Sequence, residues 1–358
     1  MADSSTGIVV LLNNLAIETS TFRDDLTSSK VFDSISLNYE TISSALERSC
    51  TSEISMKNQT LVSEIVLLGF QNLHNLKIPL FSLFLLIYIM TVWENILIIV
   101  LVSSSRKLQS PMYFFLQQLA LCDLVVSTII VSILLQTLIS DEVSMSLFGC
   151  ISQMYFWGAS ECFECLLLAV MSYDRYVAIC IPLRYSSIMS HRVCVIVIVM
   201  SWIISIFSLL ITAKLIGSLR FCEQKNINHF FCDMDPLLQM SYSDTFLVQI
   251  EAILLSILEV IFPFILICVS YMCIAHEILK IVSNTGRQKA FSTCSSHLAV
   301  VSIFYGTLIA IYVVPPSKRS QILSKVLSLL YTVLTPLVNP LIYSLRSKDI
   351  KDAFKQLT

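Results

Sequence analysis

The chain has 358 residues, of which 56% are apolar and only 13% are charged. Soluble globular domains carry roughly 25% charged residues, so about half of the usual solubilising charge is missing. The composition therefore indicates an integral membrane protein. The formal net charge of −2 lacks the basic excess that nucleic-acid binding requires, and we expect no nucleic-acid partner.

Residues 1–78 precede the first long apolar stretch and are rich in acidic side chains. Residues 1–55 are dominated by Ser, Thr, Asp and Glu, a composition typical of disordered chain. Residues 56–78 contain the sequon Asn58-Gln59-Thr60, which accepts an N-linked glycan in segments that face the exterior. We therefore expect an extracellular segment over residues 56–78 with glycosylation at Asn58.

Seven apolar stretches follow, and each has at least the roughly 20 residues that a helix needs to cross a bilayer. Each must be helical, because lipid offers no hydrogen-bonding partner to a free backbone group. The stretches are 79–102, 112–139, 149–180, 193–215, 246–275, 294–314 and 325–346. The sequence therefore predicts an all-α membrane protein whose seven-helix bundle occupies residues 79–346.

The distribution of Lys and Arg predicts the orientation, since short cytoplasmic loops carry an excess of these residues. The basic segments are the loops after the first, third and fifth stretches and the chain after residue 346. The acidic segments are the N-terminal region and the long loop 216–245. This pattern predicts an N-terminus outside the cell and a C-terminus in the cytoplasm.

The last residues, 347–358, have the spacing of a short amphipathic helix. Its apolar face would contain Ile350, Phe354 and Leu357, and its basic face Lys348, Lys351 and Lys355. A helix of this kind lies on an anionic lipid surface, so membrane lipids are expected partners. The alternative is a frayed polar tail.

Several polar side chains interrupt the spans, where they are costly unless they face the interior of the bundle. We expect Asn95, Asp123 and Glu164 to form an intramembrane polar core. Asp123 and Glu164 would hold a sodium ion or a proton, and a plain hydrogen-bond network between helices is the alternative. No catalytic constellation, cofactor motif or zinc-ligand spacing is present, so we expect neither an enzyme nor a resident cofactor.

Five sequence strings carry more specific information. They are PMYFFL (111–116), MSYDRYVAICIPLRY (171–185), SY (270–271), KAFSTCSSHL (289–298) and NPLIYSLR (339–346). In identity and order they resemble the signatures of vertebrate odorant receptors, which are rhodopsin-like G-protein-coupled receptors. The resemblance covers about residues 56–358.

The resemblance implies a multi-pass receptor of the plasma membrane that binds small odorants in the outer half of its bundle. It further implies activation of a stimulatory heterotrimeric G protein, which raises cyclic AMP, and a disulfide bond between Cys150 and Cys232. An Asp-Arg pair at the cytoplasmic end of a helix can hold the guanidinium until a switch releases it. The residues expected to serve coupling and activation are Asp174, Arg175, Tyr176, Tyr271, Asn339, Pro340 and Tyr343.

Helical spacing and the resemblance together predict the lining of the ligand site. Its expected members are Trp157, Gly158, Glu161, Cys162, Ser256, Glu259, Tyr305, Leu308, Ile309, Tyr312 and Thr332. Most are apolar or aromatic, which suits small and weakly polar ligands. Glu161 and Glu259 depart from the expected pattern, because the resemblance leads us to expect no acid at either position. Two acids in one apolar site would favour a cationic ligand such as an amine, or a metal ion. The alternative is that both are protonated and hydrogen-bonded to neighbours.

Two further interpretations remain open at this point. The string beginning at Met56 resembles the ordinary start of an odorant receptor, so residues 1–55 are interpreted as a gene-prediction artefact, with a translated disordered tail as the alternative. The intramembrane carboxylates also permit a different class of protein, a membrane transporter or ion-conducting protein. The Asp-Arg-Tyr string and the absence of internal repeats favour the receptor.

Overall fold

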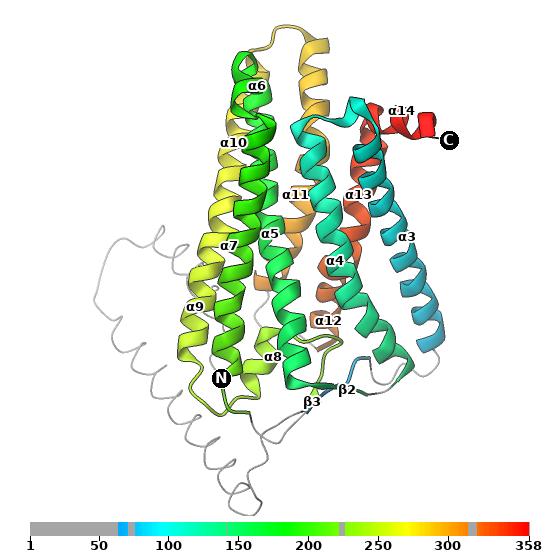
Figure 1. Ribbon diagram of the computed structural model, residues 1–358, viewed down its shortest axis with the longest axis vertical. Helices are drawn as coiled ribbons and strands as arrows, with labels where there is room; N and C mark the ends of the chain where they lie inside the picture. Colours follow the sequence, from blue (N-terminus) through cyan, green and yellow to red (C-terminus); the bar gives the residue numbers. More distant parts are fainter. Residues whose placement is uncertain (1–63, 71–75, 141, 222–225, 314–320, 358) are drawn as a thin grey trace, which may run out of the picture.

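The computed structural model describes residues 64–70, 76–140, 142–221, 226–313 and 321–357. The predictions for residues 1–55 and for Asn58 lie outside these ranges. Within them, the chain forms a bundle of long helices with a small β-sheet at one end (Figure 1).

Six helical segments are long and apolar enough to cross a membrane, and each coincides with a predicted span. They are α3 (Lys77–Ser104), α4 (Pro111–Ile139), α5 (Leu147–Cys180), α7 (His191–Gly217), the segment Phe246–Lys280 and the segment Ile322–Tyr343. A seventh helix, α11 (Asn284–Val313), contains the shorter apolar stretch Cys294–Ala310. The predicted seven-helix bundle is confirmed for the described part of the chain.

Two of these segments contain a π-helical turn, and in both cases a proline stands two residues after the end of the turn. The first consists of α9 (Phe246–Ser256), η3 (Ile257–Ile261) and α10 (Phe262–Lys280), and the second of α12 (Gln321–Leu329), η5 (Leu330–Leu334) and α13 (Thr335–Arg346). Proline lacks an N–H, and its ring clashes with the carbonyl four residues earlier. For Pro263 and Pro336 those carbonyls belong to Glu259 and Thr332, which both lie in the wider π turns.

The two ends of the bundle differ clearly (Figure 1). One end, here called the tail end, carries α6 (Tyr185–Ile188), the turns η1 (Arg106–Leu108) and η2 (Pro182–Arg184), and the C-terminal α14 (Lys348–Leu357). The helix predicted after the last span is confirmed by α14, whose Ile350 and Ala353 are buried while Lys351 and Lys355 are exposed. The opposite end, the sheet end, carries α8 (Met234–Gln239) and the strands.

The sheet joins three segments that are far apart in the sequence. Its strands are β1 (Glu64–Leu67), β2 (Val143–Ser146) and β3 (Asn226–Ile227), in the order β2-β1-β3. The central β1 runs antiparallel to β2 and parallel to β3. Its alternate residues Ile65 and Leu67 are fully buried, as a half-buried strand requires. This sheet was not predicted, and it fixes the chain before the first span onto two loops.

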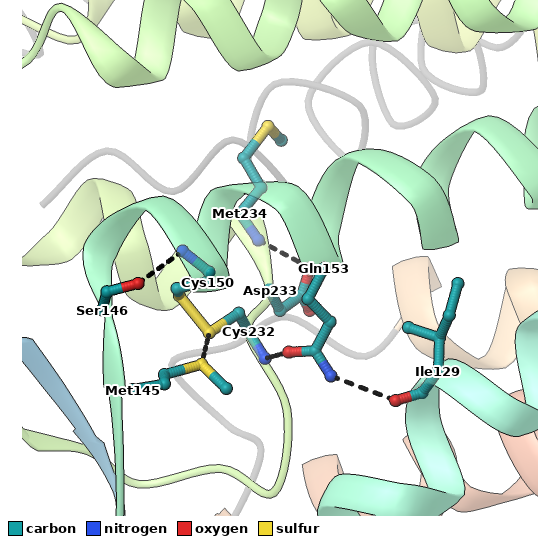
Figure 2. Close-up of a disulfide and its surroundings, with 9 residues drawn as sticks. Ile129, Met145, Ser146, Cys150, Gln153, Cys232, Asp233 and Met234 are labelled. Carbon is teal, nitrogen blue, oxygen red and sulfur yellow. Dashed lines mark hydrogen bonds between the residues drawn. A yellow bond between two sulfur atoms is a disulfide. The ribbon is translucent and has the colours of Figure 1, made fainter.

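The predicted disulfide bond between Cys150 and Cys232 is confirmed and attaches the long loop to the first turn of α5 (Figure 2). Gln153, one turn further along α5, supports the same contact. Its Oε1 accepts from the backbone N–H of Cys232 at 3.0 Å, and its Nε2 donates to the carbonyl of Ile129 at 3.5 Å. The loop is therefore fixed to both α4 and α5.

Burial separates an inner surface from an outer one. Phe115 and Phe163 lie fully buried between the helices, whereas Trp93, Phe207 and Phe262 are largely exposed on the periphery. Large exposed apolar side chains on several helices are unfavourable in water. They match a bundle whose outer surface contacts lipid.

Candidate ligand and activation sites

The predicted polar core is a hydrogen-bonded cluster at the centre of the bundle. Nδ2 of Asn339 in α13 donates to Oδ1 and Oδ2 of Asp123 in α4, at 3.2 and 3.3 Å. The same nitrogen lies 3.2 Å from Oε1 of Glu164 in α5. All three residues are buried, so these contacts link three helices without solvent between them. Asn95 lies apart from them, donating instead to the carbonyls of Pro336 and Thr91 at 3.1 and 2.9 Å.

This cluster is the interhelical network that was the alternative to an ion site. No group of three His, Cys, Asp or Glu side chains with the geometry of a metal site occurs among the described residues. A sodium ion near Asp123 and Glu164 therefore stays a prediction. In this network the Asn339 amide nitrogen is the donor to two neighbouring carboxyl groups. A proton shared by the two carboxyl groups would be the simplest means of reducing the repulsion between them.

At the tail end, Arg175 is held by its neighbour Asp174. The guanidinium Nε donates to Oδ2 of Asp174 at 2.9 Å, and its terminal nitrogen contacts the same oxygen. The other carboxylate oxygen accepts from the Tyr185 hydroxyl of α6 at 2.7 Å. Burial and the adjacent Asp174 charge raise the pKa of Tyr185, which keeps its hydroxyl protonated as a donor. The arrangement can hold Arg175 in a closed position, as the sequence predicted.

A second contact at this end joins α10 to α11. The Tyr271 hydroxyl lies 2.7 Å from Nδ1 of His297, and the two rings stack with centroids 5.8 Å apart. Both side chains lie within electrostatic range of Arg175. Tyr343 is buried nearby, whereas Tyr176 is half-buried and packs between the two apolar clusters of this region. Of the predicted activation residues, Asp174, Tyr271 and Tyr343 lie near the Arg175 guanidinium, whereas Asn339 belongs to the polar core.

The predicted ligand residues differ in their burial and in the contacts that they make. Ile309 is 50% exposed, and Gly158 packs against α7, where an added Cβ would lie 3.1 Å from Cδ1 of Leu209. Ser256 donates to the carbonyl of Ala252 within its own helix. Thr332 is buried and likewise donates to its own helix, at Ser328. Leu308 packs against the main core, and the side chain of Tyr312 lies outside the described part.

The remaining predicted residues lie on or around α5 over about two turns. Glu259 of η3 and Cys162 of α5 lie within electrostatic range of each other, as do Tyr305 of α11 and Cys165 in the next turn. Tyr305 also stacks on Phe264, with ring centroids 4.7 Å apart.

Towards the sheet end, the Trp157 ring meets Phe231 of the long loop and Tyr331 of η5, at 5.4 and 5.8 Å. The indole N–H lies near Glu161, one turn on, without making a hydrogen bond of normal geometry. Glu161 also lies within electrostatic range of Glu164. Together these contacts form an aromatic, acid-containing region in the sheet-end half of the bundle.

Comparison with known proteins decides the family. The olfactory receptor family model matches residues 84–358. Olfactory receptor 5G3 of Homo sapiens is 45% identical over 300 residues, which cover 84% of this chain and 96% of that protein. Olfactory receptor 1468 of Rattus norvegicus is 43% identical over 297 residues, covering 83% and 95% respectively. The chain belongs to the olfactory receptor family.

This membership makes the protein a multi-pass receptor of the plasma membrane and not an enzyme. The transporter or ion-conducting alternative has no counterpart in these relatives. The motif strings that suggested the family all lie within the matched region, and the described ones lie at the tail end or in the polar core.

Sequence reasoning missed three contacts of this olfactory receptor. Lys325 in α12 is buried, and its Nζ contacts the carbonyl of Gly69 and donates to Oδ1 of Asn228 at 2.7 Å. It also lies 5.4 Å from the centroid of the Phe70 ring. A lysine within an apolar span is costly and usually functional, and this was the available signal. The Tyr185–Asp174 and Tyr271–His297 bonds were missed because no spacing rule connects those segments.

Proposed function

We propose that this olfactory receptor binds a small molecule in the sheet-end half of its bundle and activates a stimulatory G protein, raising cyclic AMP. The sheet end then faces the exterior and the tail end the cytoplasm. The observation that supports this most directly is the closed Asp174–Arg175 pair at the end opposite the aromatic and acidic region. A ligand that favoured release of Arg175 would connect the two ends.

Two helices provide the connection. From Glu161 to Arg175, α5 spans roughly 20 Å at 1.5 Å per residue, and Glu259 to Tyr271 spans about 18 Å. Both distances run from the ligand region to the groups around Arg175. The π turn η3 and Pro263 interrupt the helical segment Phe246–Lys280. The two halves of this segment, α9 and α10, can therefore change their relative tilt. Ligand binding would shift the population of such an element and not create a new state.

The experiment measures cyclic AMP in cells that express the full chain and are challenged with a panel of neutral odorants and amines. Signals are normalised to surface receptor. We expect a response that disappears when the stimulatory G-protein α subunit is deleted and that Arg175→Ala abolishes, while Arg184→Ala, on the exposed side of the same end, retains it. A response that persists without the G protein, or a ligand-evoked current in its absence, would contradict the proposal.

A further inference from the structure

Glu259 is a buried acid that lacks a full set of partners. Its side chain is 97% buried within the bundle, since only 3% of the residue surface is exposed, and Oε2 has no hydrogen-bond partner among the described residues. The Cys162 thiol lies within electrostatic range of this carboxyl and is at most a weak donor. More than nine in ten buried polar groups in proteins are hydrogen-bonded, so an orphaned carboxyl oxygen at this depth requires an explanation.

Among the described residues, no basic side chain forms an ion pair with this acid. The ion pairs within the described residues are Arg175–Asp174 and Lys280–Glu277, both at the tail end of the molecule. Instead, the neighbourhood is acidic, because Cys162 lies within electrostatic range of both Glu259 and Glu161. Glu161 in turn is near Glu164. A buried carboxylate without a counter-charge costs several kcal/mol, and each additional acid nearby increases that cost.

Two further groups have no hydrogen-bond partner among the described residues. They are the indole N–H of Trp157 on α5 and the hydroxyl of Tyr305 on α11, both of which have aromatic rings as neighbours. On α5, the residues from Trp157 to Cys165 cover about 12 Å of helix. An acid, two donors and several ring faces therefore border one short stretch of α5.

We propose that the ligand of this site carries a protonated amine, whose N–H groups donate to Oε2 of Glu259, and an apolar body that packs on the surrounding aromatic rings. The inference rests on the proposed receptor function and names its ligand class. Primary amines are protonated at neutral pH, since their pKa is near that of lysine, about 10. An ammonium group supplies up to three donors and one positive charge, which matches the orphaned oxygen and the acidic surroundings.

Glu251 provides a matched control in the same helical segment. Its Oε1 accepts from the Thr212 hydroxyl of α7 at 2.7 Å. Its second oxygen also lacks a protein partner, but the side chain is only half-buried and faces α7 instead of Cys162. Glu251 is also an electrostatic neighbour of Glu259, so its substitution changes a carboxyl in the same segment while leaving the Glu259 side chain in place.

The test uses Cys162 as a reporter of occupancy in membranes that contain the full chain. Methyl methanethiosulfonate labels free thiols, and peptide mass spectrometry measures the labelling rate at each cysteine. The probes are matched pairs: hexylamine and hexanol, cyclohexylamine and cyclohexanol, phenethylamine and phenethyl alcohol. We expect at least one amine to slow labelling of Cys162 while its alcohol does not, and Cys273, which is exposed, to react at one rate throughout.

In Glu259→Gln, the amine concentration that gives half-protection should rise roughly ten- to hundredfold, the range for a hydrogen bond to a charged group. Glu251→Gln should leave it unchanged. Equal protection by amine and alcohol, survival of amine protection in Glu259→Gln, or no protection by any amine would each overturn the assignment. Protection by an amine without a cyclic AMP response would support the amine site and contradict the proposed coupling. A cyclic AMP response to alcohols alone would support the coupling and contradict the amine site.

Discussion

The sheet end should open in acid because of one histidine. The imidazole of His229 is only 5% exposed, lies against the rings of Phe230 and Phe231, and is 3.4 Å from the Ser328 hydroxyl through Nε2. Its backbone carbonyl accepts from the N–H of Gly69 at 3.2 Å, which extends the contact between β1 and β3. Burial, together with the positive charge of Lys325, lowers the pKa of His229 from 6.5 to about 3.

The magnitude follows from linkage between protonation and opening. Above pH 6.5 the imidazole is neutral whether the sheet end is closed or open, and the closed form keeps its full stability. Below pH 6.5 the open form binds a proton that the closed form excludes, so stability is lost as the pH falls towards about 3. At pH 5 the loss is about 2 kcal/mol, or a roughly 30-fold larger open population.

Hydrogen exchange at the amides of Leu68 and Gly69 measures this opening directly. Their N–H groups donate to the carbonyls of Ile227 and His229 and are released when the strands separate. Full-length receptor is compared with His229→Gln, which stays neutral at every pH, so that intrinsic exchange chemistry and the acids of the loop affect both proteins equally. We expect the wild-type opening constant to rise about 30-fold more than that of the variant between pH 7.5 and 5. Parallel behaviour of the two proteins would refute the reasoning.

Two other substitutions test the receptor, one at the sheet end and one at the tail end. Gly69 has φ +48°, and an added Cβ would lie 2.5 Å from Cβ of Thr137. Gly69→Ala should therefore reduce the stability of the closed sheet end by about 1–3 kcal/mol and accelerate hydrogen exchange in β1. The control Gly306→Ala, with open space around the added Cβ, should leave exchange in β1 unchanged. Tyr185→Phe removes the hydrogen bond to Asp174, worth about 1.5–3 kcal/mol for a charged acceptor, and should raise ligand-independent cyclic AMP per surface receptor severalfold. Unchanged basal cyclic AMP would show that this bond does not hold the closed state.

The bundle could be predicted from the sequence because the bilayer leaves few alternatives. An apolar stretch long enough to cross must be helical, and the predicted spans coincide with observed helices. The main difference is at α11, which begins at Asn284, ten residues before the predicted span, because a helix is free to continue into water beyond the lipid. The same rule predicted that Asp123 and Glu164 lie inside the bundle, since polar groups in lipid turn inward. Their shared partner is Asn339, which was assigned to activation, whereas the predicted third member Asn95 lies apart.

The sheet end was not predictable in the same way. The four-residue β1 lies in a segment with no repeated pattern, and it is stabilised by pairing with loops about 80 and 160 residues away. Lys325 illustrates the limit further. Its position in an apolar span indicates a role, but the partners Gly69 and Asn228 are known only from the fold.

The ligand site shows how one local irregularity limits reasoning from helical spacing. An extra residue in a π turn rotates everything before it by about the 100° that separates neighbours in an α-helix. Positions from Tyr271 back to η3 keep ordinary helical spacing, and Glu259 in η3 lies within electrostatic range of Cys162. Positions before the turn, including Ser256, are rotated relative to that spacing, so sequence spacing alone does not fix the face that they present. Pro263 has no N–H for the carbonyl of Glu259, so the π turn lies where the helix cannot make that hydrogen bond.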